Sequence, residues 1–170
     1  MTFAGLGQLE ATPEILRLLM GGLSEADTNW KPAPDRFSIA EALEHLSHAE
    51  GHCFRVQVQR MVEKDNPEIE PYDTEGHIAA GQYSGRNAED SFDHFEEQRE
   101  LNVEYLRDLP DIASGRKGTH PSLGTITVAN LMNEWALHDL GHIRQIAEIV
   151  RALKYFPAMG PLQSQYKLNP

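Results

Sequence analysis

The stretch TVANLMNEWALHDLGHIRQIAEIVRALKY, residues 127–155, has the clearest helical period in the chain. Its apolar residues recur at intervals of three and four, which places them on one face of an α-helix. They are Val128, Leu131, Trp135, Ile149 and Ala152, widened by Met132, Ala136, Ile143, Ile146, Val150 and Leu153. A helix with one apolar face needs other elements to cover that face. The stretch therefore predicts a protein built from packed helices.

Three further segments supply the partners of this helix. They are residues 13–23, 38–63 and 88–109. The second has the clearest start, because Ser38 and Glu41 fit a capping box, in which each side chain binds an orphan backbone N–H. Thr12 is the expected cap of the first, with Pro13 at its first helical position. We expect an all-α, antiparallel four-helix bundle in up-down-down-up order, because the connection over 66–87 is long enough for a crossover.

The remaining segments carry no convincing strand pattern. Residues 110–124 are expected to form a loop and residues 157–170 an irregular tail. We find no internal repeat, and a chain of 170 residues suits a single domain over 1–170. A domain of this size buries about two-thirds of the surface that its unfolded chain exposes. Neither a disulfide nor a metal is therefore needed merely for folding.

Charge and composition exclude several classes of partner. The chain has 15 basic and 26 acidic residues, a net charge of −11, which opposes binding to nucleic acid or to an anionic membrane. No apolar run approaches the roughly 18 residues of a spanning helix, and no cationic segment precedes an apolar one at the start, so we expect no signal peptide. The single cysteine, Cys53, cannot form an intrachain disulfide, which fits a cytoplasmic location. We expect a small-molecule substrate.

Eight histidines are the unusual feature of the composition. His138 and His142 are four residues apart on the predicted helix, so their Cβ atoms should be about 5–6 Å apart. Both lie in line with the apolar seam, where an imidazole is costly unless its nitrogens find partners. A metal ion is one such partner. A pair of hydrogen-bonded core histidines is the alternative.

A third ligand is expected from the helix over residues 38–63. His45 lies at the edge of its apolar arc and is the first choice, and His48, rotated toward the polar side, is the fallback. His45 and His52 are about 10.5 Å apart along the axis and cannot both reach one ion. Three neutral imidazoles suit zinc, nickel, copper or ferrous iron. Such a site leaves a coordination position for water or substrate, as catalytic sites do.

Three polar residues near these histidines are candidates for the catalytic site. Asp139 is placed to orient a ligand imidazole or to act as a general base. Glu50 lies inside the apolar arc of its helix, so it needs a buried partner or a role in the site. Gln145 continues the histidine seam, from which it can contact a substrate.

The sequence resembles the DinB-like superfamily, also called the DinB/YfiT-like metalloenzymes. Residues 37–46, FSIAEALEHL, together with Glu50 resemble the W-S-x-x-E-x-x-x-H-L opening of that family's second helix, with Phe37 in place of Trp. The motif HPSLG at 120–124 precedes the last helix, and HDLGHIRQ occupies 138–145. The spacing of these motifs extends the resemblance over nearly the whole chain.

This resemblance implies a crossover four-helix bundle with a divalent metal, zinc or nickel, held by His45, His138 and His142. Members of the superfamily include S-transferases that use low-molecular-weight thiols, and members are often dimers. The resemblance therefore implies a metal-dependent S-transferase that acts on small electrophiles with a thiol cosubstrate, in a homodimer. A metal-dependent hydrolase and a non-enzymatic metal-binding protein are the alternatives.

Overall fold

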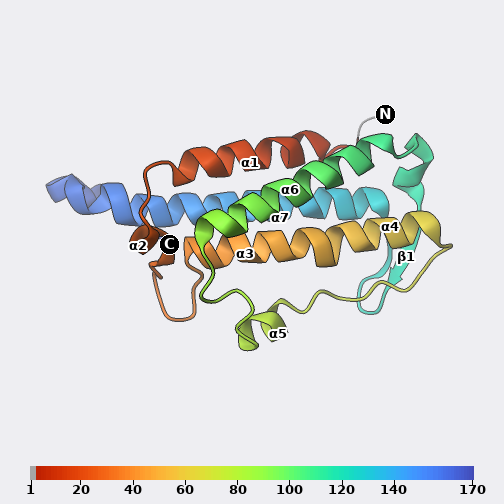
Figure 1. Ribbon diagram of the computed structural model, residues 1–170, viewed down its shortest axis with the longest axis horizontal. Coiled ribbons are helices and arrows are strands. Elements are labelled where there is room, and N and C mark those ends of the chain that lie inside the picture. Colours follow the sequence, from red (N-terminus) through yellow and green to blue (C-terminus); the bar gives the residue numbers. More distant parts are fainter. Residues whose placement is uncertain (1–2) are drawn as a thin grey trace.

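The computed structural model describes residues 3–170, so the first two residues of the predicted domain 1–170 lie outside the described part. Within that part, four long helical segments lie side by side, which confirms the predicted all-α bundle (Figure 1). They are α1 (Leu6–Met20), α3 (Ile39–Ala49) continued by α4 (Arg55–Glu63), α6 (Ala88–Asp108) and α7 (Val128–Val150). Helix α3 packs mainly against α6, and α1 packs mainly against α7.

The second and third of these segments follow each other in the chain and run in the same direction. Figure 1 shows α3–α4 and α6 running one way, and α1 and α7 running the other. Residues 64–87 pass back along the bundle between α4 and α6, and they include the short helix α5 (Thr74–Ala79). A second short helix, α2 (Glu25–Asn29), lies between α1 and α3. The return segment places α5 beside α3, where its side chains reach those of the bundle.

Side-chain caps mark the starts of α3, α6 and α7. The Ser38 hydroxyl accepts a hydrogen bond from the Glu41 backbone N–H at 3.1 Å, and the Glu41 carboxylate accepts one from the Ser38 backbone N–H at 2.9 Å. This capping box confirms the predicted start of the second helix. A second box, between Thr127 and Asn130, starts α7, and Asn87 caps α6.

The second and fourth helical segments each contain a π turn. Glu50–Phe54 joins α3 to α4, and Arg151–Tyr155 continues α7. A π turn inserts i→i+5 hydrogen bonds and rotates the residues that follow relative to a regular α-helix. The side chains beyond Glu50 therefore face other directions than a uniform period of 3.6 residues predicts.

The predicted start of the first helix at Pro13 is wrong, because α1 begins at Leu6 and contains Pro13. A proline inside a helix leaves the carbonyl four residues earlier without its usual partner. Here that carbonyl belongs to Leu9, and it accepts a hydrogen bond from Arg99 Nη1 at 2.9 Å. Thr12 is not a cap, and its hydroxyl donates to Asp139 Oδ2 at 2.6 Å. Contacts from other helices thus let α1 continue through the proline.

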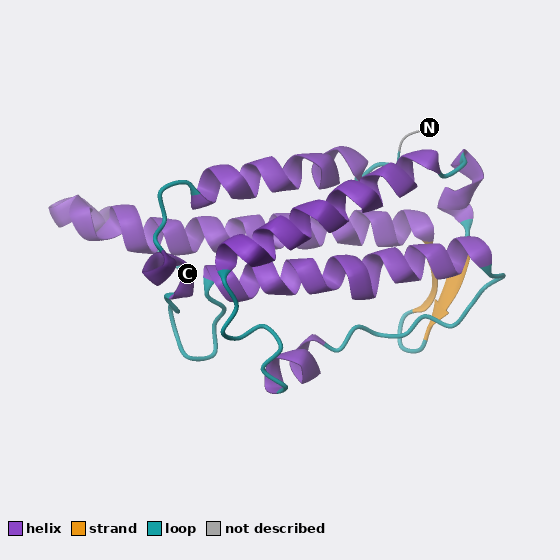
Figure 2. Cartoon of the chain, viewed as in Figure 1, coloured by secondary structure: helices purple, strands orange, loops and turns teal. Residues whose placement is uncertain are grey.

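The expected loop over 110–124 and irregular tail are also corrected. Strands β1 (Lys117–His120) and β2 (Gly124–Thr127) pair antiparallel, with Lys117 opposite Thr127, at the end of the bundle where α7 begins (Figure 2). Their glycine and threonine content gives no alternation of apolar residues, which explains why the pattern predicts no strand. The tail forms a 3₁₀ segment over Phe156–Gln165.

Two apolar clusters form the core, with a polar layer between them. One cluster includes Leu9, Val58, Met61 and Trp135, and the other includes Leu16, Leu43, Phe95 and Ile146. Each long helical segment contributes at least one buried polar residue to the layer between the two clusters. This layer contains Thr12, Glu50, Arg99, Asn102 and Asp139.

Candidate metal centre

The structure brings together the three histidines that the sequence nominates as ligands. His45 comes from α3, and His138 and His142 come from consecutive turns of α7. One ring nitrogen from each lies within 4.8 Å of the other two, and the Nε2 atoms of His45 and His138 are 3.0 Å apart. Within residues 3–170, no other three His, Cys, Asp or Glu side chains converge in this way.

The environment keeps all three imidazoles neutral. Burial, reinforced by the other histidines, lowers the pKa of His45 to about 3 and the pKa of His138 to about 2. Burial also lowers the pKa of His142, although its hydrogen bond with Gln145 acts in the opposite direction. The neutral form of histidine is the form that binds a metal ion. The triad is therefore in the ligand form at neutral pH without any need to lose protons.

The nitrogen atoms of the triad fit a divalent transition metal. The Nδ1 atoms of His45 and His138 are buried and have no hydrogen-bond partner among the described residues. Three imidazole nitrogens form a donor set that suits zinc, nickel and their neighbours in the first transition series. Gln145, which the sequence nominates for substrate contact, lies with its Oε1 2.9 Å from His142 Nδ1 and so fixes the orientation of that ring.

Glu50 and Asp139 do not point to the histidines but share one buried arginine. Arg99 donates through Nε and Nη2 to the two oxygens of Glu50, at 3.1 and 2.5 Å. It donates through Nη1 and Nη2 to Asp139, at 2.6 and 3.0 Å. Burial opposes the positive charge, but the two carboxylates raise the pKa of Arg99 above its ordinary value. Trp135 Nε1 and Asn102 Nδ2 also donate to the Glu50 carboxylate, at 2.7 and 2.9 Å.

The structure gives these two carboxylates partners other than the histidines. Asp139 is 1% exposed and is paired with Arg99 and Thr12, not with an imidazole. Glu50 does have the buried partner that its position requires. Sequence reasoning misses Arg99, although Phe92, Phe95 and Arg99 follow each other at helical spacing on one face of α6. A charged residue within an apolar stripe was the available signal.

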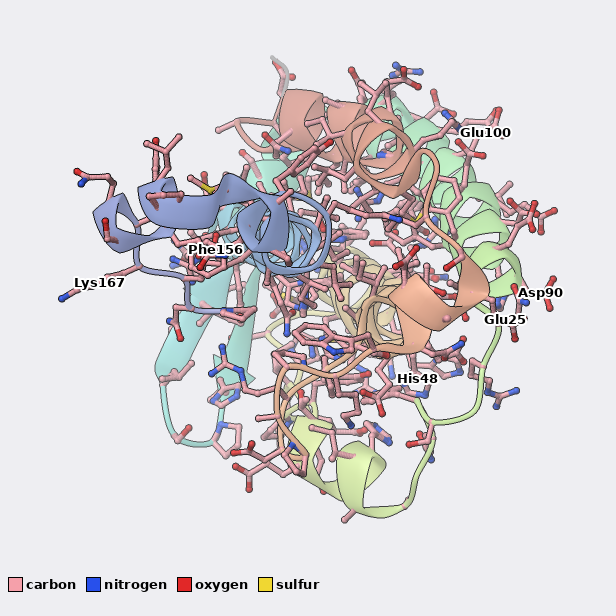
Figure 3. The ribbon with its side chains drawn as sticks, turned by 90° about the vertical axis from the view of Figure 1, so that its left-hand side faces the viewer. Glu25, His48, Asp90, Glu100, Phe156 and Lys167 are labelled. Atoms are coloured by element: carbon pink, nitrogen blue, oxygen red, sulfur yellow. The ribbon has the colours of Figure 1, made fainter. Side chains whose placement is uncertain are left out.

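The other histidines lie outside the triad. His48, the fallback ligand, has its Nδ1 2.6 Å from the Tyr72 hydroxyl, and its ring stacks on His52 with centroids 4.2 Å apart. His77 on α5 lies 4.6 Å from His48 between ring centroids, and Figure 3 shows His48 on the side of the bundle that faces α5. His120 holds its own loop, because its Nδ1 accepts hydrogen bonds from the backbone of residues 122 and 123.

Two cavities reach the triad. One, of about 310 Å³, is lined by His45 and His138 together with Tyr72 and Glu134. The other, of about 680 Å³, is lined by His138 and His142. Sequence reasoning misses Glu134, which stands one helical turn before His138, so that Glu134, His138 and His142 follow each other at intervals of four. The four-residue spacing that identifies the histidine pair is therefore also the sequence signal for Glu134.

The fold and the site define a helical-bundle protein in which three converging imidazoles line two cavities. A family model described as the DinB superfamily matches residues 8–146, and the chain belongs to the DinB superfamily. A solved structure of YfiT from Bacillus subtilis, described as a probable metal-dependent hydrolase with an unusual four-helix bundle topology, is similar to this fold. The TM-score is 0.78 and the identity 19%, over 88% of this chain and 85% of that chain.

No curated protein matches the chain. Over residues 3–170, no helix has both the length and the apolar character that crossing a bilayer requires.

Proposed function

We propose that the chain is a metal-dependent hydrolase that holds one divalent transition metal, zinc or nickel, through His45, His138 and His142. The observation that carries this proposal is the convergence of three neutral imidazole nitrogens within 4.8 Å on two helices. The likeness of the fold to YfiT, described as a probable metal-dependent hydrolase, supports the same class of activity.

The residues around the triad have separate roles in the proposed hydrolysis. A bound divalent ion supplies Lewis acidity, which polarises a substrate oxygen and favours loss of a proton from a nucleophile. Glu134 lines the smaller cavity with His45 and His138, and its carboxylate is exposed and free to take a proton from a water molecule there. Gln145 holds the His142 ring, and Phe54 and Leu131 give the smaller cavity apolar walls.

A second candidate is an S-transferase that uses a low-molecular-weight thiol and a small electrophile. The observation that favours it is the presence of two cavities at the triad, one lined by His45 and His138 and the other by His138 and His142, because a reaction of two substrates needs a place for each. In this reaction Glu134 takes the thiol proton, and the sulfur forms a bond to the electrophile as the leaving group departs. The homodimer and the cytoplasmic location remain predictions from the sequence.

Metal content tests the ligand set directly. We expect the purified protein to contain about one equivalent of zinc or nickel, and His45→Ala, His138→Ala and His142→Ala to retain less than about a tenth of an equivalent. His52→Ala is the matched control, since His52 is exposed and outside the triad, and it should keep the metal of the parent protein. Equal metal content in all four variants would contradict the assignment.

Activity then separates the three classes. Metal-loaded protein is offered small activated esters without thiol, and a small electrophile with a panel of thiols. Glu134→Gln should retain the metal yet lose activity by about 10²–10⁴-fold, because general-base catalysis is removed. Ester cleavage supports the hydrolase, and thiol consumption supports the S-transferase. A protein that binds metal and performs neither reaction above the level of His138→Ala is a non-enzymatic metal-binding protein.

A further inference from the structure

The larger cavity beside the triad carries positive charge that the proposed reaction does not use. Arg36 from the loop before α3, Arg144 from α7 and Arg151 from the π turn after α7 line it together with His138 and His142. The lining includes one carboxylate, that of Glu148. Three guanidinium groups on one cavity are unexpected in a chain with a net charge of −11.

Among residues 3–170, an internal ion pair engages one of the three arginines. Arg151 forms an ion pair with Glu148, whose second oxygen accepts a hydrogen bond from the Asn169 backbone N–H at 3.0 Å. That carboxylate is therefore engaged at both oxygens. Arg36 and Arg144 have no acidic partner within residues 3–170, and both side chains are exposed. Their charges are available to a ligand in the cavity.

We propose that this cavity is an anion subsite, in which Arg36 and Arg144 bind a carboxylate or phosphate group of the substrate. The inference rests on the proposed function, since it places the anionic group in the cavity whose wall is formed by His138 and His142. A guanidinium presents a planar fork of N–H donors that matches both kinds of oxyanion. The volume of about 680 Å³ lies in the range of small-molecule sites. The substrate class is thus a small molecule with an anionic end.

The subsite also has a physical role in selecting substrates. Neutral molecules gain nothing from the two arginines, so the subsite favours anionic molecules over uncharged ones of the same shape. Because the arginines are exposed, the attraction is screened and should weaken as salt is added.

Anion binding is measured by calorimetry on metal-free and zinc-loaded protein, with inorganic phosphate and succinate as the probes. Arg36→Gln and Arg144→Gln should each weaken binding to the metal-free protein by about three- to tenfold, as expected for an exposed charged contact. Lys117→Gln is the matched control, because it removes the same charge from an exposed side chain on β1, outside the cavity. Unchanged circular dichroism and melting show that each variant is folded.

The outcomes separate this inference from the proposed function. Binding of phosphate or succinate that weakens in Arg36→Gln and Arg144→Gln supports the subsite. The probe that binds the parent protein more tightly identifies the preferred anion. Failure of the metal-free protein to bind either probe overturns the subsite, as does equal binding by Arg36→Gln, Arg144→Gln and Lys117→Gln. If the parent protein binds neither zinc nor nickel but shows arginine-dependent anion binding, the proposed function fails while the subsite stands. If phosphate binds only to zinc-loaded protein and independently of the arginines, the subsite is overturned.

Discussion

Arg99 shows, at the scale of single residues, how far sequence patterns reach. The position of Glu50 within an apolar arc predicts that it needs a buried partner, and it has one. The identity of that partner could not be predicted, because Arg99 lies on α6 and a single sequence does not state which side chains meet across helices. For the same reason, the sequence alone predicts that Asp139 lies with the histidines. Its neighbour His138 faces His45, whereas Asp139 itself faces Arg99.

Arg99→Met tests the cost of breaking this cluster. Removal of the arginine leaves the buried carboxylates of Glu50 and Asp139 without a positive charge beside them, and should lower the free energy of unfolding by about 3–5 kcal/mol. Arg107→Met is the control, because the ion pair of Arg107 with Glu10 is exposed and should be worth about 1 kcal/mol or less. Urea denaturation measures both. A loss in Arg99→Met no greater than in the control would show that the cluster does not stabilise the fold.

Cys53 provides a prediction about reactivity. The thiol is buried, and burial, together with the charge of Glu134, raises its pKa to about 12. Because the thiolate is the reactive form, native protein at pH 8 should react with a thiol reagent at least about 10²-fold more slowly than protein unfolded in urea. The rate should rise as the pH approaches the raised pKa. Equal rates for native and unfolded protein at pH 8 would contradict the burial of this side chain.

At the scale of elements, local signals were sufficient where they act within a few residues. The capping box at Ser38 marks a helix start that the structure confirms. The start of α1 was not predictable, because the Leu9 carbonyl left free by Pro13 finds its donor on another helix. No periodic pattern in the sequence predicts the π turn over Glu50–Phe54 or the strands β1 and β2.

Ser38→Ala tests the contribution of one cap. The substitution removes the acceptor for the Glu41 backbone N–H at a buried helix start, and should lower the free energy of unfolding by about 1 kcal/mol. Ser84→Ala is the matched control, because Ser84 is an exposed turn residue and its replacement should change the same quantity by less than about 0.5 kcal/mol. Thermal or urea unfolding distinguishes them. Equal stability of the two variants would argue against the cap.

At the scale of the whole molecule, the sequence predicts the triad better than its surroundings. The spacing of His138 and His142 and the place of His45 on its helix were enough to select the three residues that converge. The cavities depend on segments far apart in the chain, including the loop with Arg36 and the tail with Asn169, so no local pattern could reveal them.

Metal loading should stabilise the molecule as a whole. An ion that binds only the folded state at a concentration of about 100 times its dissociation constant adds about 2.7 kcal/mol to the free energy of unfolding. For a chain of this size we expect the melting temperature to rise by about 5–10 °C with zinc, and to fall again on chelation. His138→Ala should show neither change, whereas His52→Ala should behave as the parent protein does. A shift of equal size in His138→Ala would place the stabilising ion elsewhere.

The buried polar layer of Thr12, Glu50, Arg99 and Asp139 fixes the axial register of the four helical segments. Apolar helix faces can pack in several axial registers, because one leucine can replace another in the contact. A buried guanidinium that binds two carboxylates can be satisfied in one register alone. Asp139 directly follows His138, so a slip of α7 by one turn would break the match with Arg99 and carry the imidazoles past His45. The Arg99 cluster therefore sets the axial register of α3 and α7 in which the ligand nitrogens meet.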